Sequence, residues 1–350
     1  MDFQLFSKIS SLPGASGREE LLRSEIIKIV SPYVDEVRED AFGNVIALSK
    51  AEAGDKNPLK LMLAAHMDEV AMRVKYIDAN GFLRFVLTGG IDPRTLLSQR
   101  VIIQTENNGN LLGVIGAKPA HYLTAADKTS ATTADSLFID TGFGAKAREI
   151  FSIGDPVTLE RIPAEFGSDM FCAKAIDDRA GVYILIEALK ALPGKHRADI
   201  YFVFSAQEEF GLIGAQVSSF AIRPDIALAV DTTGALDMPG IAPQDYVLEM
   251  GKGIGITLVD SSTIADYKLG KYLQKICRRD NIAFQLRVAA RGGNDAKVMQ
   301  RSAEGIPVCA LSLPVRYIHS NVECASKKDV DSAVALVSKF AAEFAKSGLK

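Results

Sequence analysis

Acidic and histidine side chains follow the apolar runs of this chain where each run ends. Four such runs lie at 59–65, 199–205, 225–230 and 308–313. The polar residues that follow them are, in turn, His66 with Asp68, Glu208 with Glu209, Asp231, and His319. Two adjacent glutamates repel each other and are costly to bury. One such pair or one His-x-Asp is a common accident, but the same arrangement after four runs indicates a site.

The apolar runs have the length and composition of strands. LKLMLAA (59–65), for example, has no polar alternation, which is typical of strands buried on both faces of a sheet. Between the runs, the segments 177–192 and 329–346 space their apolar residues at helical intervals. The pattern predicts an α/β fold with a mostly parallel or mixed sheet covered by helices on both faces. In such sheets the ligand crevice lies outside the carboxyl ends of the strands.

One stretch departs from this pattern. From about 70 to 167, short alternating segments are separated by the turn signals ANG, NNGN and GDP, and 124–136 is polar and loose. We interpret 70–167 as an inserted small β-barrel domain. The catalytic α/β domain would then be discontinuous, comprising 1–69 and 168–350.

Histidines and carboxylates without cysteine suit a divalent ion such as zinc, cobalt or manganese. Two such ions carry four positive charges, of which Asp177, Glu209 and Asp231 balance three. A hydroxide would balance the fourth, and hydroxide is the nucleophile of a hydrolase. Glu208 is then left over beside the ions, free to move a proton. On this interpretation Glu209 binds metal and Glu208 transfers a proton.

Charge and composition exclude several other classes. The net charge of −3 gives no electrostatic reason to bind nucleic acid or an anionic membrane. No apolar stretch approaches the roughly 20 residues that span a bilayer. The start of the sequence, MDFQLFSKIS, does not resemble a secretory signal, and the four cysteines have no ligand spacing. We therefore expect a cytoplasmic protein with reduced thiols.

Six motifs in order, AHMDEV, AIDDRAG, SAQEEFGLIGA, VDTT, GGNDA and RYIHS, resemble the glutamyl/leucyl aminopeptidase family of cocatalytic metallopeptidases. That family includes the tetrahedral aminopeptidases, and some members have been labelled endoglucanases. The resemblance covers nearly the whole chain. It implies a zinc-exopeptidase-like fold and two divalent ions per subunit, zinc first and cobalt or manganese as alternatives.

The resemblance also implies a role for each residue. His66 and Asp231 would hold one ion, and Glu209 and His319 the other. Asp177 would bridge the two ions, with a cis peptide bond to Asp178. Asp68 would be a catalytic residue that buttresses His66, and Glu208 would be the general base and acid. Asn294 and Lys297 depart from the usual pattern around GGNDA, which leaves the substrate preference open.

The expected activity is removal of the N-terminal residue from short peptides. Two alternatives stay open, a related amidohydrolase (deacylase or carboxypeptidase) and a catalytically inactive scaffold. A glutamyl preference would follow if Arg291 or Lys252 reached the first subsite, although charges in such loops, including Arg287 and Lys297, more often face solvent. The resemblance further implies a homo-oligomer, from a dimer to a dodecamer, assembled through the insertion.

The remaining histidines serve as controls for this interpretation. His196 lies in the polar turn PGKHRAD, which predicts a solvated side chain. His121 lies within the insertion and is interpreted as structural. The glycines of GKGIGI (251–256) lack the lysine and helix of a phosphate-binding loop, so we interpret them as a strand edge that approaches the site.

Overall fold

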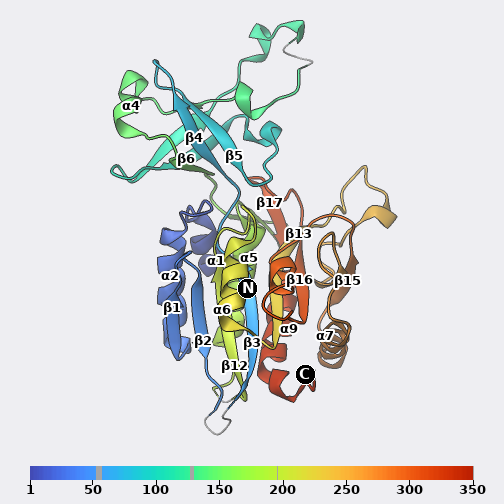
Figure 1. Ribbon diagram of the computed structural model, residues 1–350. Coiled ribbons are helices and arrows are strands. Elements are labelled where there is room, and N and C mark those ends of the chain that lie inside the picture. The colour runs from blue at the N-terminus through green and yellow to red at the C-terminus, as the bar shows by residue number, and fades with distance from the viewer. Residues whose placement is uncertain (53–56, 127–129, 195, 350) are drawn as a thin grey trace.

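A computed structural model describes residues 1–52, 57–126, 130–194 and 196–349. Its centre is an eight-stranded mixed sheet (Figure 1). From one edge to the other the strands are β1 (Glu36–Glu39), β2 (Val45–Ser49), β12 (Ala198–Ser205), β3 (Leu59–His66), β13 (Ile226–Gly234), β16 (Val308–Val315), β14 (Ile254–Val259) and β15 (Phe284–Val288). Neighbours in the group β12, β3, β13 and β16 run parallel, so their carboxyl ends lie at one end of the sheet.

Both faces of this sheet are covered, as the unbroken apolar runs predict. Leu61 and Leu63 of β3 pack into the larger core, with the helices α1 (Phe3–Ser11), α2 (Glu20–Val30), α5 (Ile176–Lys190), α7 (Tyr267–Asp280) and α9 (Lys327–Glu343). Met62 and Ala64 of the same strand pack into a smaller core beneath α6 (Ile213–Ile222) and α8 (Ala296–Met299). Successive side chains of a strand point to opposite faces, so each face needs its own apolar residues. The predicted α/β fold is confirmed.

A closed barrel follows β3 and lies beyond the end of the sheet (Figure 1). Around the barrel the strands are β4 (Ala71–Ile77), β5 (Leu83–Thr88), β8 (Ile139–Asp140), β7 (Asn110–Ile115), β6 (Gln99–Gln104) and β9 (Pro156–Leu159). Its interior is a separate apolar cluster that includes Met72, Phe85 and Ile103. The barrel strands lie within the range 70–167. Of the segment predicted to be loose, 127–129 lie outside the described residues, and Ala134–Ser136 form a single 3-10 turn.

A small three-stranded sheet contributes Phe171, Ala173 and Ala325 to the larger core. It is formed by β10 (Ala164–Phe166), β11 (Met170–Ala173) and β17 (Glu323–Ser326). β11 leads into α5, and β17 leads into α9. This sheet therefore ties together two segments that are distant in the sequence and that carry Asp177 and His319. Among the described residues, no helix is both long and apolar enough to cross a bilayer.

Candidate metal centre

The predicted site residues come from the carboxyl ends of adjacent strands. His66 is the last residue of β3 and is paired in register with Ser205, the last residue of β12. Asp231 lies in the next strand, β13, opposite Ser312 of β16. The glutamates begin three positions after Ser205, the end of β12, and His319 lies in the turn between β16 and β17. Because the parallel strands end together, their polar termini meet at one edge of the sheet.

Asp177 joins the two histidines. Its Oδ1 lies 3.2 Å from Nε2 of His66, and its Oδ2 lies 3.1 Å from Nε2 of His319. Each of the two carboxylate oxygens therefore faces a different imidazole. The peptide bond between Asp177 and Asp178 is cis, as the resemblance implied.

Two more carboxylates complete the group on either side of Asp177. Oδ1 of Asp231 lies 3.8 Å from Nε2 of His66, and Oε1 of Glu209 lies 3.4 Å from Nε2 of His319. The ligand atoms of His66, Asp177 and Asp231 all lie within 4.8 Å of one another, as do those of Asp177, Glu209 and His319. These two three-residue sets share Asp177, and His66, Glu208 and Glu209 form a third such group beside them.

The donor chemistry of these sets fits divalent ions. Imidazole nitrogens and carboxylate oxygens are ligands for zinc, cobalt and manganese. In the described part of the chain, the buried Oε1 of Glu209 has no hydrogen-bond partner, although a buried carboxylate oxygen normally has one. A cation between Glu209 and His319 would satisfy it. The residues present therefore fit the two-ion hypothesis.

The buried carboxylates of the site lie close enough together to shift one another's pKa values. Burial, and then the charge of Asp177, raise the pKa of Glu209 to about 7 and that of Asp231 well above its usual range. Burial also raises the pKa of Glu208. Burial alone would lower the pKa of His319, but the hydrogen bond and charge of Asp177 raise it to about 10. The protein alone leaves an excess of buried negative charge, which is an environment that favours bound cations.

Asp68 contacts more than the imidazole it was expected to buttress. Its Oδ1 lies 3.4 Å from Nδ1 of His66, whereas its backbone carbonyl lies 3.0 Å from the same nitrogen. Its carboxylate accepts the backbone amides of Glu208 and Glu209 and the hydroxyl of Ser16. It is fully buried. Asp68 therefore fixes the backbone of both glutamates as well as the position of the histidine.

Two supporting carboxylates were not predicted from the sequence. Glu323, on β17, accepts the backbone amide of Asp177 at 2.9 Å and that of His319 at 2.6 Å. Asp178 accepts the backbone amide of His66 at 3.2 Å. Burial, followed by the charge of Asp177, raises the pKa of Glu323 to about 8. Nothing in the local sequence around Glu323 signals this task, because its partners come from other parts of the chain.

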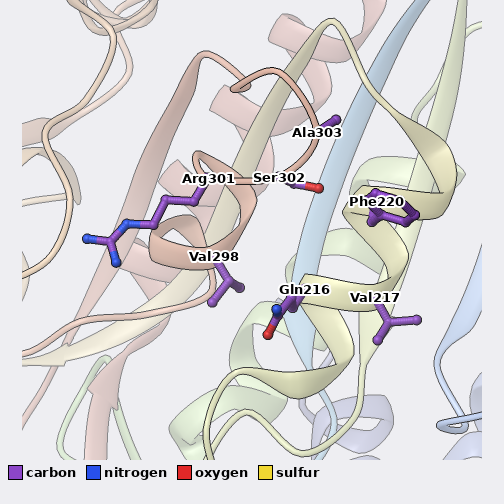
Figure 2. A pocket seen from close by; sticks show the side chains of 7 residues that line it. All are labelled: Gln216, Val217, Phe220, Val298, Arg301, Ser302 and Ala303. Atoms are coloured by element: carbon purple, nitrogen blue, oxygen red, sulfur yellow. The ribbon is translucent and has the colours of Figure 1, made fainter.

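The candidate metal ligands line a pocket of about 280 Å³, which also includes Thr232, Gly292, Asn294 and Arg287. A larger hollow of about 620 Å³ lies elsewhere, between α6 and residues 298–303 (Figure 2). Its lining includes Val217, Phe220 and Val298, and its sole charged member is Arg301. Its lining has no acid or histidine to assist hydrolysis. The smaller pocket is therefore the candidate site.

Two predictions about other polar residues require correction. His196 is buried rather than solvated, because its ring nitrogens lie 2.7 Å from the carbonyl of Ala198 and 2.8 Å from the hydroxyl of Ser49. Arg287 is buried in the candidate pocket and is not a surface charge. Lys252 and Arg291 are exposed and do not contribute to the pocket lining.

The other candidates remain outside the site. Lys297 is half-buried and His121 is exposed in a 3-10 turn beside Tyr122, and neither belongs to the pocket lining. The glycine-rich loop at 251–256 has a structural partner. Its Gly251 and Gly253 amides donate to the carboxylate of Asp329, and a Cβ at Gly253 would lie 2.2 Å from the backbone of Ala283. The loop is built to pack rather than to bind phosphate.

Comparisons with known proteins agree with this geometry. Residues 43–336 match the family model of the M42 glutamyl aminopeptidases. The chain is 38% identical over 345 residues to the lysyl aminopeptidase of Pyrococcus furiosus, covering 96% of this chain and 95% of the relative.

Two solved structures share the whole fold. An aminopeptidase from the archaeon Desulfurococcus kamchatkensis has a TM-score of 0.91 and 37% identity, covering 97% of this chain and 94% of its own. The TET1 peptidase of Pyrococcus horikoshii, described as assembling into a tetrahedron or a large octahedral shell, has a TM-score of 0.87 and 32% identity, covering 97% and 99%. The family match spans most of the chain and agrees with the six motifs. The chain belongs to the M42 glutamyl aminopeptidase family.

Proposed function

We propose that this protein is a dinuclear, metal-dependent aminopeptidase that removes the N-terminal residue from short peptides. The observation that carries the proposal is Asp177, whose two carboxylate oxygens face two different histidines. A carboxylate that bridges two ions binds each ion through a different oxygen, and the two oxygens of Asp177 are placed in this way. His66 and Asp231 would hold one ion, and Glu209 and His319 the other. When bound, such a pair polarises the scissile carbonyl and activates water.

Glu208 is our candidate for the proton carrier. Its Oε2 lies 4.0 Å from Nε2 of His66, and its carboxylate lies close to His66 and Glu209, outside the two sets that contain Asp177. Burial raises the pKa of its carboxyl group above the ordinary value, the direction expected for a group that carries a proton during catalysis. It would take a proton from the attacking water and give it to the departing amino group. Asp68 would hold Glu208 in position through its backbone amide.

An aminopeptidase must also recognise a free N-terminus. The pocket is small, at about 280 Å³, and its lining is rich in carboxylates that can hold an ammonium group. A deacylase or carboxypeptidase remains the alternative. The barrel lies between His66 and Asp177, whereas those relatives place their extra domain after the paired glutamates. An inactive scaffold is disfavoured because every proposed ligand and Glu208 meet in one pocket. A glycosidase would not need the histidines.

Aminopeptidases differ in the N-terminal residue that they remove best. The family is described as glutamyl aminopeptidases, whereas the relative from Pyrococcus furiosus is named a lysyl aminopeptidase. The charge of the preferred residue therefore varies among similar proteins. We propose a glutamyl preference for this chain. Zinc is the proposed native metal, with cobalt or manganese as alternatives, because the donors are imidazoles and carboxylates without thiolate.

We further propose that the protein is a cytoplasmic homo-oligomer, from a dimer to a dodecamer, assembled through the barrel. The barrel carries exposed apolar side chains on the two strands that flank β8, including Leu112 and Val114 of β7 and Val86 of β5. Such a surface is typical of a subunit contact. The similar TET1 peptidase is described as assembling into a tetrahedron or a large octahedral shell. Light scattering that shows a monomer of 37.7 kDa at every concentration would contradict this proposal.

The function is tested with aminoacyl-p-nitroanilides. The purified protein is stripped with a chelator, reloaded separately with Zn²⁺, Co²⁺ or Mn²⁺, and assayed. We expect hydrolysis to depend on metal and to be lost in Glu208→Gln. Hydrolysis that survives removal of the metal would contradict the proposal. Peptides blocked at the N-terminus distinguish an aminopeptidase from the alternative amidohydrolases, because an aminopeptidase requires the free ammonium group.

A further inference from the structure

The barrel contacts the candidate metal centre through two consecutive glycines. Gly89 and Gly90 follow β5 of the barrel (Figure 1), where the chain leaves this strand toward β6. A Cβ at Gly90 would lie 2.8 Å from Nδ1 of His319. A Cβ at Gly89 would lie 3.3 Å from Oε2 of Glu209. Both neighbours belong to the three-residue set of Asp177, Glu209 and His319, here called the second set.

The carbonyl of Gly90 also faces the imidazole of His319, 3.2 Å from its Nδ1. A carbonyl oxygen accepts hydrogen bonds and donates none, so Nδ1 must carry the hydrogen of this bond. In a neutral imidazole the lone pair is then on Nε2, which lies 3.1 Å from Asp177 and 3.4 Å from Glu209. A histidine that binds metal usually donates from its other ring nitrogen, and this bond fixes the orientation of the ring. Gly90 therefore holds His319 in the tautomer that can bind metal.

The other histidine of the centre is supported from a different part of the chain. Nδ1 of His66 lies 3.0 Å from the backbone carbonyl of Asp68, two residues further along the chain. That support is local to the end of β3 in the main sheet. The support of His319 comes from Gly90, which lies 229 positions away in the sequence. The half of the centre that contains His319 therefore depends on the barrel.

The turn that carries His319 needs such support. His319 has a φ of +62°, a left-handed conformation that is uncommon for a residue with a side chain. Such a conformation persists when the surrounding structure holds it. Glu323 accepts its backbone amide, and the carbonyl of Gly90 faces its ring. The side chain of Asn321, in the same turn, donates to the side chain of Gln99 on β6, so the barrel contacts this turn twice.

The two glycines differ in what a side chain would meet. Gly89 has a φ of +88°, and a Cβ there would also lie 2.8 Å from Cγ1 of Val70, so a substitution is strained for several reasons. Gly90 has no left-handed φ. Among the described residues beyond its chain neighbours, a Cβ at Gly90 would meet the ring of His319 alone within 4 Å. Gly90 is therefore the cleaner position at which to test the contact.

We propose that Gly90 is a positioning residue for the second metal ion. Its carbonyl orients His319, and its lack of a side chain leaves room for the imidazole. The inference rests on the proposed function, because His319 must be a metal ligand. It gives the barrel a task at the metal centre besides any contact between subunits. A methyl group at Gly90 would displace the imidazole from Asp177 and Glu209, whereas the ion at His66 would keep its ligands.

The first test compares Gly90→Ala with Gly116→Ala. Gly116 also follows a barrel strand, β7, and a Cβ there would meet no atom within 4 Å among the described residues. The stripped proteins are titrated with Zn²⁺ in competition with a chelator, which gives two dissociation constants. In Gly90→Ala the second constant should rise about 10- to 100-fold, while the first stays within about threefold. Gly116→Ala should match the wild type in both constants.

The failures of the inference and of the proposed function are distinguishable in this titration. If the wild type binds two ions and Gly90→Ala leaves the second constant unchanged, the inference is overturned and the two-ion centre stands. An equal rise of both constants in Gly90→Ala would overturn it as well, because the effect would not be confined to the second set. A wild type that binds a single ion would contradict both the inference and the proposed two-ion centre.

The second test removes the imidazole. If a methyl group at Gly90 acts through His319, it should have no further effect in the His319→Ala background. The melting temperatures of the four metal-free proteins are compared. Gly90→Ala should lower the melting temperature of the wild type, because the methyl group crowds the ring, and should leave that of His319→Ala unchanged. An equal decrease in both backgrounds would show that Gly90 has a structural role independent of His319 and would overturn the assignment.

Discussion

The carboxylate of Asp68 accepts a hydrogen bond from the backbone amide of Glu208, with 2.9 Å between Oδ1 and the nitrogen. The second oxygen accepts the amide of the following residue, Glu209, at 3.1 Å. One buried side chain therefore connects the segment after β3 to the segment after β12. The two glutamates, to which we assign different tasks, share one backbone support.

Replacing Asp68 by Asn tests this support. Asn retains the size of the side chain, but its amide group would place a donor where the carboxylate accepts, and it removes the negative charge beside His66. We expect kcat to fall about 10- to 100-fold. Ser16→Ala removes a single hydroxyl donor to Asp68 and should cost less than tenfold. Full activity in Asp68→Asn, with the metal content unchanged, would show that the support is dispensable.

Asp177→Ala tests the shared ligand. Because one residue contributes an oxygen to each three-residue set, both ions should be weakened or lost together. Glu209→Gln alters one set and is the comparison, in which the other ion should be retained better. Elemental analysis after gel filtration gives the metal content per chain. Two tightly held ions in Asp177→Ala would exclude the bridging role.

Substitutions of the two adjacent glutamates should have different effects on metal content and kcat. Glu208→Gln is expected to keep its metal content and to lose kcat by a factor on the order of 10² to 10⁴, as the loss of a general base does. Glu209→Gln should weaken metal binding as well. Metal content and kcat are measured on the same preparations. Nearly full activity in Glu208→Gln would overturn this division of tasks.

A prediction about pH concerns Asp329, whose carboxylate accepts two amides of the glycine loop at 2.6 Å each. Burial raises its pKa from 3.8 to about 6. The folded state therefore binds this proton more tightly, and the contribution of Asp329 to the free energy of unfolding falls as pH rises from about 4 to about 6. Asp329→Asn cannot titrate.

The test is urea unfolding of both proteins at several pH values. The stability of the wild type relative to Asp329→Asn should decrease between pH 4.5 and pH 7 by about 1 to 3 kcal/mol. Other carboxylates titrate in both proteins, so the difference isolates Asp329. A difference that stays constant across this range would show that the pKa of Asp329 is close to its ordinary value in the folded protein.

The sequence was informative where local pattern determines structure. The run at 59–65 supplies apolar residues to two cores, which is why it lacks polar alternation and why His66 marks its carboxyl end. Parallel strands that end together then bring distant polar residues to one edge. The barrel was predictable from its turns because hairpins are local.

Partners distant in the sequence were not predictable in this way. Glu323 accepts the backbone amide of Asp177, which lies 146 positions away in the sequence. His196 is hydrogen-bonded to Ser49, which lies 147 positions away. Arg287 looked like a loop charge, because only the folded chain shows that β15 and the turn at Gly292 enclose it beside the pocket. Burial of a polar residue by segments from elsewhere leaves no trace in its own neighbourhood.

We propose above all that this protein uses bound metal to remove the first residue of a peptide. The most direct measurement is mass spectrometry of the products from one short peptide beginning with glutamate, presented with a free and with an acetylated N-terminus. We expect the metal-loaded enzyme to release residues one at a time from the free peptide, and to leave the acetylated peptide intact. Release from the carboxyl end, internal cleavage, or equal cleavage of both peptides would contradict the account.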